Sequence, residues 1–143
     1  MEILLISHKG AASGMKSAAE LIVGESAKNI GVLELTAEAG VEVFAEELEK
    51  YLTSWLADGK MGLIFADLKG GTPFNQAEMI LAKHGLKGQA KVVSGMNLPM
   101  LLENLFLEVD QWSKEDIQDI LTVGRDGIDC MDIAASDEES EDE

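Results

Sequence analysis

The sequence predicts an α/β domain with a mostly parallel four-stranded sheet, helices on both faces and a short C-terminal edge strand. Short continuous apolar runs, typical of strands buried on both faces, alternate with longer segments whose apolar residues recur at helical spacing. The chain has 143 residues, of which 46% are hydrophobic, enough to bury one core. No apolar run approaches the roughly 18 residues that span a membrane, so we expect no transmembrane helix.

The first half of the chain contains three predicted strands, at residues 3–6, 30–35 and 61–66. A helix separates each strand from the next, and Asp58 and Gly59 end the second helix. Each helix is predicted by apolar residues on one face. These residues are Met15, Ala18, Ala19 and Ile22 in the first helix, and Phe44, Leu48, Tyr51, Leu52 and Trp55 in the second.

A third helix and a fourth strand follow. Thr72 is the expected N-cap of the helix, and Pro73 suits its first position because proline lacks the N–H that a helix start leaves unpaired. His84 and Gly85 form a favourable helix end. Residues 90–94 are then the fourth buried strand.

The last elements are two capped helices and a short strand. Asn97 is expected to cap the first of these helices and Ser113 the second, because both side chains can accept a hydrogen bond from a first-turn N–H. Residues 128–133 predict a short strand at an edge of the sheet. We expect residues 1–133 to form the domain and residues 134–143 to form a disordered acidic tail.

The charge balance is strongly acidic, which excludes some functions. Lys and Arg number 11 against 27 Asp and Glu, for a net charge of −16, and six of the acids lie in the last eight residues. Such a chain lacks the basic face that nucleic-acid binding requires. The single cysteine, Cys130, cannot form an intrachain disulfide and fits a reducing cytoplasm. The N-terminus does not resemble a signal peptide.

Polar residues follow three predicted strands at their carboxyl ends, where open α/β sheets bind ligands. His8 follows the first strand, Asp67 the third, and Met96 and Asn97 the fourth. If the first and third strands are neighbours, His8 and Asp67 lie close together. A carboxylate that accepts a hydrogen bond from one ring nitrogen fixes the tautomer and leaves the other nitrogen as a nucleophile. We therefore predict a nucleophilic histidine.

A glycine-rich turn, which contains Gly70, Gly71 and Thr72, lies between Asp67 and the third helix. Its free backbone N–H groups and the helix dipole favour an anion, above all a phosphoryl group. The combination predicts a histidine that accepts a phosphoryl group, a reaction that needs mainly positioning and charge stabilisation. Each part alone has an ordinary structural explanation, so the prediction depends on their joint occurrence at strand ends.

Other polar residues near these segments have two readings. Lys9 and Lys69 would screen the phosphoryl charge or guide a docking partner, or would be solvated loop lysines. Met96 and Asn97 would contact a partner, although core packing explains Met96 as well. His84 is explained by a favourable charge at a helix C-terminus. Nothing in the sequence suggests a metal or an organic cofactor.

Three segments together resemble the enzyme IIA component of the mannose family of the bacterial sugar phosphotransferase system. They are ISHKGAASG from Ile6, ADLKGGTPFN from Ala66 and SGMNLPML from Ser94. The GGTPFN and GMNLPML stretches are the specific ones. The resemblance runs through most of the chain in the same order and with matching spacing.

The resemblance implies a covalent relay in the cytoplasm. The histidine phosphocarrier protein HPr would phosphorylate His8, Asp67 would orient the ring, and Gly70, Gly71 and Thr72 would hold the phosphoryl group. His8 would pass the group to enzyme IIB, which phosphorylates the sugar that enters through the membrane components IIC and IID. The link between this chain and IIC and IID would therefore be indirect. The family forms homodimers in which a C-terminal strand pairs with the partner's sheet, a role that residues 128–133 could play. The transported sugar is not identified by the sequence.

Two departures from the family pattern and three alternatives remain. Lys9 stands where family members have glycine, which puts the loop geometry in question. The acidic tail stands where some members continue into IIB, so a separate IIB is expected.

A related phosphotransfer subunit serves dihydroxyacetone kinase, but the GGTPFN loop favours the mannose type. A flavodoxin-like module that binds FMN or a nucleotide should carry more hydroxyls in residues 8–14. A regulatory protein controlled by phosphorylation of His8 also stays open.

Overall fold

A four-stranded, all-parallel sheet lies at the centre of the molecule, and the order of its strands is β2-β1-β3-β4. The structure, a computed structural model, describes residues 1–132. The strands are β1 (Glu2–His8), β2 (Gly31–Leu35), β3 (Gly62–Ala66) and β4 (Ala90–Val93). The helices are α1 (Ala11–Val23), α2 (Gly40–Trp55), α3 (Thr72–Lys83), α4 (Leu98–Glu103) and α5 (Lys114–Asp126), with 3-10 turns η1 (Gly24–Ala27) and η2 (Ala57–Gly59).

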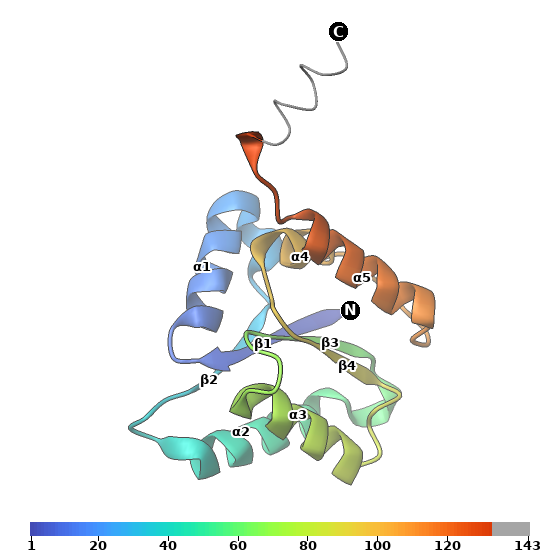
Figure 1. The fold of residues 1–143 in the computed structure, drawn as a ribbon. Helices are drawn as coiled ribbons and strands as arrows, with labels where there is room; N and C mark the ends of the chain where they lie inside the picture. Colours follow the sequence, from blue (N-terminus) through green and yellow to red (C-terminus); the bar gives the residue numbers. More distant parts are fainter. Residues whose placement is uncertain (133–143) are drawn as a thin grey trace, which may run out of the picture.

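The helices form a layer on each face of the sheet. Helices α1, α4 and α5 lie on one face, and α2 and α3 lie on the other (Figure 1). Because α1 leads from β1 to β2 and α2 leads back past β1 to β3, the chain winds in opposite directions on the two sides of β1. The switch point of the sheet therefore lies between β1 and β3, where ligands bind in this class of fold. The α/β architecture predicted from the sequence is confirmed.

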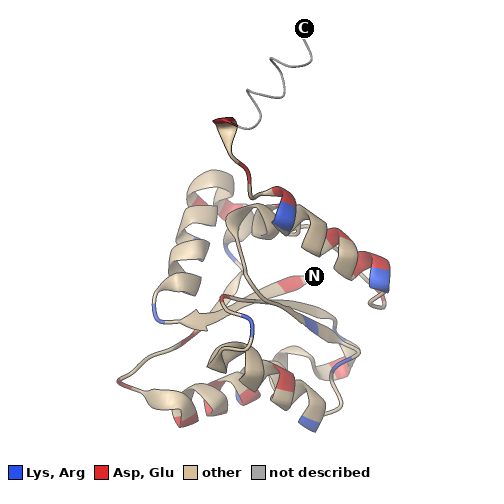
Figure 2. Ribbon diagram, in the orientation of Figure 1, with Lys and Arg blue, Asp and Glu red and all other residues tan. Residues whose placement is uncertain are grey.

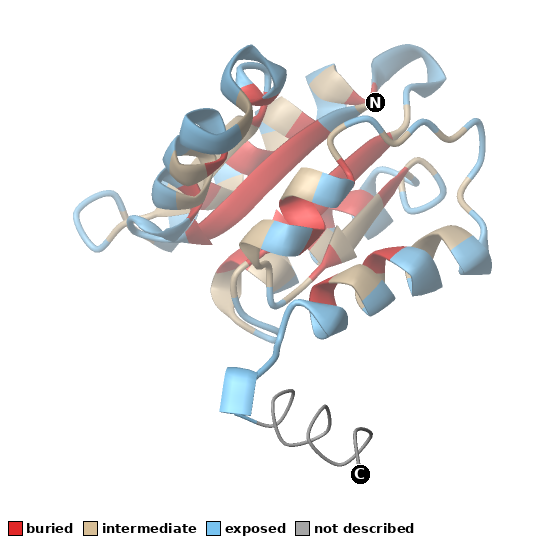
Figure 3. Cartoon of the chain, turned by 90° about the horizontal axis from the view of Figure 1, so that it is seen from above, coloured by how far each residue is buried: buried red, intermediate tan, exposed pale blue. Residues whose placement is uncertain are grey.

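The two central strands are buried on both faces, as their continuous apolar runs predict. Residues 3–6 of β1 are at most 3% exposed, and residues 63–66 of β3 are fully buried. Seen from above, these strands are the buried centre of the molecule (Figure 3). Alternate side chains point to opposite layers. Leu4 and Ile6 pack with α2 and α3, whereas Ile3 and Leu5 pack toward α1, α4 and α5.

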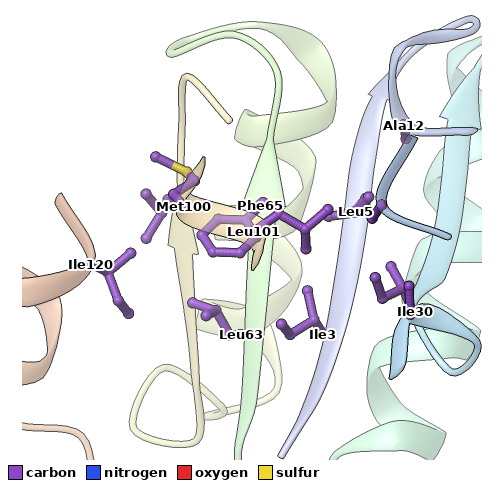
Figure 4. Close-up of a cluster of buried hydrophobic side chains, with 12 residues drawn as sticks. Ile3, Leu5, Ala12, Ile30, Leu63, Phe65, Met100, Leu101 and Ile120 are labelled. Atoms are coloured by element: carbon purple, nitrogen blue, oxygen red, sulfur yellow. The ribbon is translucent and has the colours of Figure 1, made fainter. Parts of the chain in front are cut away.

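The core beneath α1, α4 and α5 joins side chains from strands and helices that are far apart in the sequence. In Figure 4, Ile3, Leu5, Leu63 and Phe65 form a row on the strands, which Ala12, Leu101 and Ile120 approach from the three helices. All seven are at most 3% exposed. Full burial of one such large aliphatic or aromatic side chain stabilises a fold by about 1.5–3 kcal/mol. This packing fixes the sheet from which the site residues project.

The end of α2 and the start of α3 differ from the sequence predictions. Helix α2 ends at Trp55, before the predicted end at Asp58 and Gly59, which lie in η2. Ser113 forms a capping box with Asp116 at the start of α5, and the Asn97 side chain accepts the Met100 N–H at the start of α4, as predicted. The prediction that Thr72 caps α3 is wrong, because Gly71 is the N-cap and Thr72 is the first helical residue. The first helical bond, from the Asn75 N–H to the Gly71 carbonyl, starts the helix one residue earlier.

The predicted C-terminal edge strand is also wrong within the described residues. Residues 128–130 have no regular structure, and Met131 and Asp132 have helical backbone conformation. The sheet formed by residues 1–132 ends at β4. Ile128 and Met131 are 79% and 85% exposed, so within residues 1–132 no sheet covers this segment. A short segment with several apolar residues forms a strand only where a neighbouring strand supplies the ladder bonds. The end of that predicted strand and the predicted acidic tail lie outside the described residues.

Candidate active site

His8 and Asp67 meet at the switch point, as the sequence predicts. His8 is the last residue of β1, Asp67 directly follows β3, and the two strands are neighbours in the sheet. The His8 Nδ1 atom lies 2.9 Å from Asp67 Oδ2, and the His8 backbone N–H donates to the same oxygen at 3.0 Å. A carboxylate only accepts hydrogen bonds, so Nδ1 carries the proton and Nε2 keeps its lone pair. The contact leaves Nε2 as the ring nitrogen that is not engaged by Asp67.

The pair differs in exposure in the way that a surface nucleophile needs. The His8 side chain is 48% exposed, whereas Asp67 is 19% exposed. Asp67 Oδ1 is buried, and within residues 1–132 it has no hydrogen-bond partner. Both hydrogen bonds that the Asp67 carboxylate accepts within residues 1–132 therefore come from His8. The ring is held from the protein side and reaches solvent on the other.

The start of α3 lies against the His8 ring. A Cβ atom added at Gly71 would lie 3.2 Å from His8 Cε1, so a larger residue would have to displace the ring or the turn slightly. Gly70 has a φ of +75°, a left-handed conformation that glycine adopts without strain. The Asn75 side chain donates to the Gly70 carbonyl at 2.9 Å and holds this turn in place. The turn predicted from the sequence thus lies beside the histidine.

The first turn of α3 offers unused donors beside this contact. Within residues 1–132, neither the Thr72 N–H nor the Phe74 N–H has a hydrogen-bond acceptor, and Pro73 has no N–H. Such groups, together with the positive end of the helix dipole, favour an anion. A phosphoryl group is the anion that a nucleophilic histidine can carry.

The turn from β1 into α1 accommodates Lys9 without backbone strain. Gly10 takes the left-handed conformation, with a φ of +90°, and among the described residues only Asp58 does so without being a glycine. The departure from the family pattern at Lys9 therefore leaves the loop unstrained, because the neighbouring glycine makes the tight turn.

Two residues that the sequence analysis did not single out hold this turn. The buried Ser7 hydroxyl accepts the Ala12 N–H, and Glu34 on β2 accepts the Ser13 N–H, each at 2.8 Å. Burial alone would raise the pKa of the Glu34 carboxyl, but hydrogen bonds from Ser13 and Gly10, with the nearby Lys9 charge, lower it below its ordinary value. The sequence did contain a sign of this role for Glu34. Its carboxylate lies two residues after Val32, and so on the inward face of a predicted strand, where a charged residue is unusual.

The other predicted site residues lie around the pair in different ways. Lys9 is exposed and forms a 3.4 Å ion pair with Glu38, and Lys69 is exposed on the loop before Gly70. Figure 2 shows a basic segment on each of these two connections, which stand out on an acidic molecule. Met96 donates its N–H to the Ala66 carbonyl and packs against the core. The Asn97 side chain links α4 to the Gly124 carbonyl of α5 at 2.7 Å.

His84 lies in a different environment from His8. It is the C-cap of α3, and its Nε2 lies 3.0 Å from Glu49 Oε1, which also pairs with Lys83. Hydrogen bonds from Lys83 and then His84 lower the pKa of the Glu49 carboxyl. These contacts are typical of a surface ion-pair network. The predicted position of His84 at a helix end is confirmed, whereas its contact with Glu49 was not predicted.

Residues 1–132 lack two further features, a cluster of metal ligands and a membrane-spanning helix. No group of three or more His, Cys, Asp and Glu side chains is close enough to hold a metal ion. None of the helices in this part of the chain combines the length and apolar character needed to cross a bilayer.

Comparison with known proteins gives a consistent result. The family described as "PTS system fructose IIA component" matches residues 2–121. The chain is 39% identical over 106 residues to the sorbose-specific EIIA component of the phosphotransferase system (PTS) of Lacticaseibacillus casei, covering 72% of this chain and 70% of that protein. It is 29% identical over 131 residues to the mannose-specific EIIAB component of Escherichia coli K12, which covers 90% of this chain but 39% of that protein.

Solved structures agree with these sequence relatives. The mannose/sorbose specific IIA subunit of the phosphotransferase system from Enterococcus faecalis superimposes with a TM-score of 0.71 at 28% identity. The alignment covers 90% of this chain and 92% of that subunit. The similarity therefore extends over most of the fold.

Proposed function

This chain belongs to the mannose family of phosphotransferase-system IIA components, whose role is phosphotransfer in sugar uptake, and we propose that His8 is its phosphoryl carrier. His8 accepts the group from HPr and delivers it to enzyme IIB. The observation that carries this proposal is the 2.9 Å contact between His8 Nδ1 and Asp67 Oδ2, which leaves Nε2 free on a half-exposed ring. Transfer takes place in the cytoplasm, as expected for a member of this family.

The transfer is a direct exchange between two imidazole rings. The Nε2 lone pair of His8 attacks the phosphorus atom carried by HPr. The new P–N bond forms as the P–N bond to the HPr ring breaks, and the electron pair of that bond returns to HPr. The Nδ1 proton stays in its hydrogen bond to Asp67, whose negative charge offsets the positive charge that the His8 ring gains. Delivery to IIB is the same exchange with His8 as the donor.

The first turn of α3 binds the transferred group. The Thr72 and Phe74 N–H groups are the donors available to its oxygens, and Gly71 allows them to come close to the ring. These donors are fixed before the reaction, so little reorganisation is needed in the transition state. Lys9 and Lys69 add positive charge on the two loops beside the site and favour the approach of a phosphorylated partner.

The flavodoxin-like alternative is disfavoured by the turn after β1. A flavin or nucleotide phosphate would need the N-terminal N–H groups of α1. The Ala12 and Ser13 N–H groups already donate to Ser7 and Glu34, and the Glu34 carboxylate would repel an anion. The site that remains open is the start of α3, beside His8. This position favours a covalent phosphoryl carrier over a nucleotide-binding module.

Replacing Gly71 by alanine is expected to slow transfer with little loss of stability. The new Cβ would contact His8 Cε1 at 3.2 Å and displace the ring, while the φ of −72° suits alanine. A shift of a few tenths of an ångström at a reacting atom is expected to slow phosphorylation about tenfold. Rapid-quench kinetics and thermal unfolding measure the two effects.

Gly88→Ala is the matched control, because a Cβ there meets nothing within 4 Å. Equal rates for Gly71→Ala and Gly88→Ala would contradict a close role for Gly71.

The proposed function is tested by intact-mass analysis after incubation with phosphoenolpyruvate, enzyme I and HPr. We expect one acid-labile phosphoryl group per chain, transferred onward when IIB is added. NMR of the phosphorylated protein is expected to place the group on His8 Nε2. A chain that gains no mass, although the same donors phosphorylate a control IIA, would refute the proposal. The site would then have to be treated as a ligand-binding site without transfer.

A further inference from the structure

Ser7 and Glu34 form a pair across two neighbouring strands. They lie opposite each other in the register of β1 and β2, so their side chains project from the same face of the sheet. Ser7 continues the alternation of Ile3 and Leu5, which pack toward α1. His8, one residue further, projects to the opposite face, toward α3. Adjacent residues of β1 therefore serve different helices.

The pair supplies the acceptors at the start of α1. The N-cap, Gly10, has no side chain with which to cap the helix. Instead, the Ala12 N–H donates to Ser7 Oγ and the Ser13 N–H donates to Glu34 Oε2. The Ser7 side chain is fully buried, so its hydroxyl has to be satisfied by the protein.

Ser7 also holds the backbone of His8. Its hydroxyl donates to the His8 carbonyl oxygen at 2.6 Å, while the His8 N–H donates to Asp67 Oδ2 at 3.0 Å. The two backbone groups of His8 are thus fixed from opposite sides. Because the ring is attached to this backbone, a shift of the main chain would also move the ring relative to Asp67 Oδ2.

We propose that Ser7, supported by Glu34, is a positioning residue that keeps the His8 ring on Asp67 and Nε2 free for transfer. The proposal deepens the proposed function, on which its kinetic consequence depends. Its structural content, the fixed tautomer of His8, does not require any partner protein. A simpler reading is that Ser7 only caps α1. The two readings differ in what happens to His8 when the hydroxyl is removed.

The test compares Ser7→Ala, Ser7→Thr and the matched control Ser113→Ala. Ser113 also accepts a first-turn N–H, at the start of α5, and so has the capping role alone. In the free protein, ¹⁵N NMR of the imidazole is expected to show mainly the Nδ1–H tautomer for wild type and a mixture for Ser7→Ala. Phosphorylation by HPr is expected to slow about tenfold in Ser7→Ala, because the reacting atom is no longer held in place.

The controls separate positioning from capping. Ser7→Thr keeps the hydroxyl and is expected to restore the wild-type tautomer, whereas Ser113→Ala is expected to match wild type in tautomer and rate despite its lost cap. A Ser7→Ala protein with the wild-type tautomer and rate would overturn the proposal. If Ser7→Ala does not fold, Glu34→Gln takes its place, with a smaller change in the same direction expected and no change overturning the proposal.

The experiment also distinguishes the two levels of the argument. If wild type is not phosphorylated by an active donor, the proposed function fails, and the tautomer comparison still decides whether Ser7 positions His8. If wild type is phosphorylated and Ser7→Ala behaves identically, only the positioning role fails.

Discussion

Substitution of His8 by alanine is expected to abolish phosphorylation, and this is the largest effect that we predict. In the proposed function the Nε2 atom of His8 is the nucleophile, and within residues 1–132 the other histidine, His84, lies at the far end of α3 in an ion-pair network. Without the ring there is no atom to form the P–N bond. Intact mass after incubation with phosphoenolpyruvate, enzyme I and HPr measures the outcome directly.

His84→Ala is the matched control, since it also removes an imidazole that faces a carboxylate. It is expected to accept one phosphoryl group at the wild-type rate. Loss of phosphorylation in His84→Ala together with full phosphorylation of His8→Ala would show that His84, not His8, carries the phosphoryl group. Circular dichroism of both variants checks that the fold is retained, which the exposed position of His8 favours.

Asp67→Asn is expected to slow phosphorylation by roughly 100- to 10,000-fold, the range seen when a proton-handling or tautomer-fixing group is lost. Asp67 Oδ2 accepts from both the N–H and the ring of His8, and Oδ1 is buried without a partner. An amide has two unfavourable choices. Either its NH₂ group faces the two His8 donors, or its NH₂ group is buried where no acceptor is available.

Rapid-quench measurement of transfer from HPr gives this rate, and NMR of the ring gives the tautomer. Asp116→Asn is the control, because Asp116 accepts the Ser113 N–H in the capping box of α5, on another part of the chain. It is expected to transfer at the wild-type rate. A wild-type rate for Asp67→Asn would show that the carboxylate does not orient the nucleophile.

The positions of His8 and Asp67 could be predicted from the sequence because they depend on a simple property of parallel sheets. Each residue follows a short apolar run, and the carboxyl ends of parallel strands lie at one edge. The neighbouring placement of β1 and β3 then brings the side chains together. The glycine turn after Asp67 was also visible, since few residues besides glycine tolerate the left-handed conformation of Gly70.

The errors arose where a local pattern competes with a tertiary contact. Thr72 is a good N-cap by its chemistry, but the turn at Gly70 and Gly71 lets the Gly71 carbonyl accept the first helical bond, so the helix begins one residue earlier. The segment 128–133 contains several apolar residues and was predicted as a short edge strand, yet among residues 1–132 no strand pairs with it. Whether a second copy of the chain supplies that pairing stays a prediction.

The sequence by itself determined the order of the elements, the class of the sheet and the two residues at its switch point, because apolar periodicity and strand polarity are properties of local segments. Only the tertiary structure decided which face each strand-end side chain uses. Register places Ser7 and Glu34 under α1 and turns His8 toward the open start of α3. The hydrogen bond from the Ser13 N–H to Glu34 joins residues 21 positions apart. It depends on how the strands align, and no local pattern in the chain encodes that alignment.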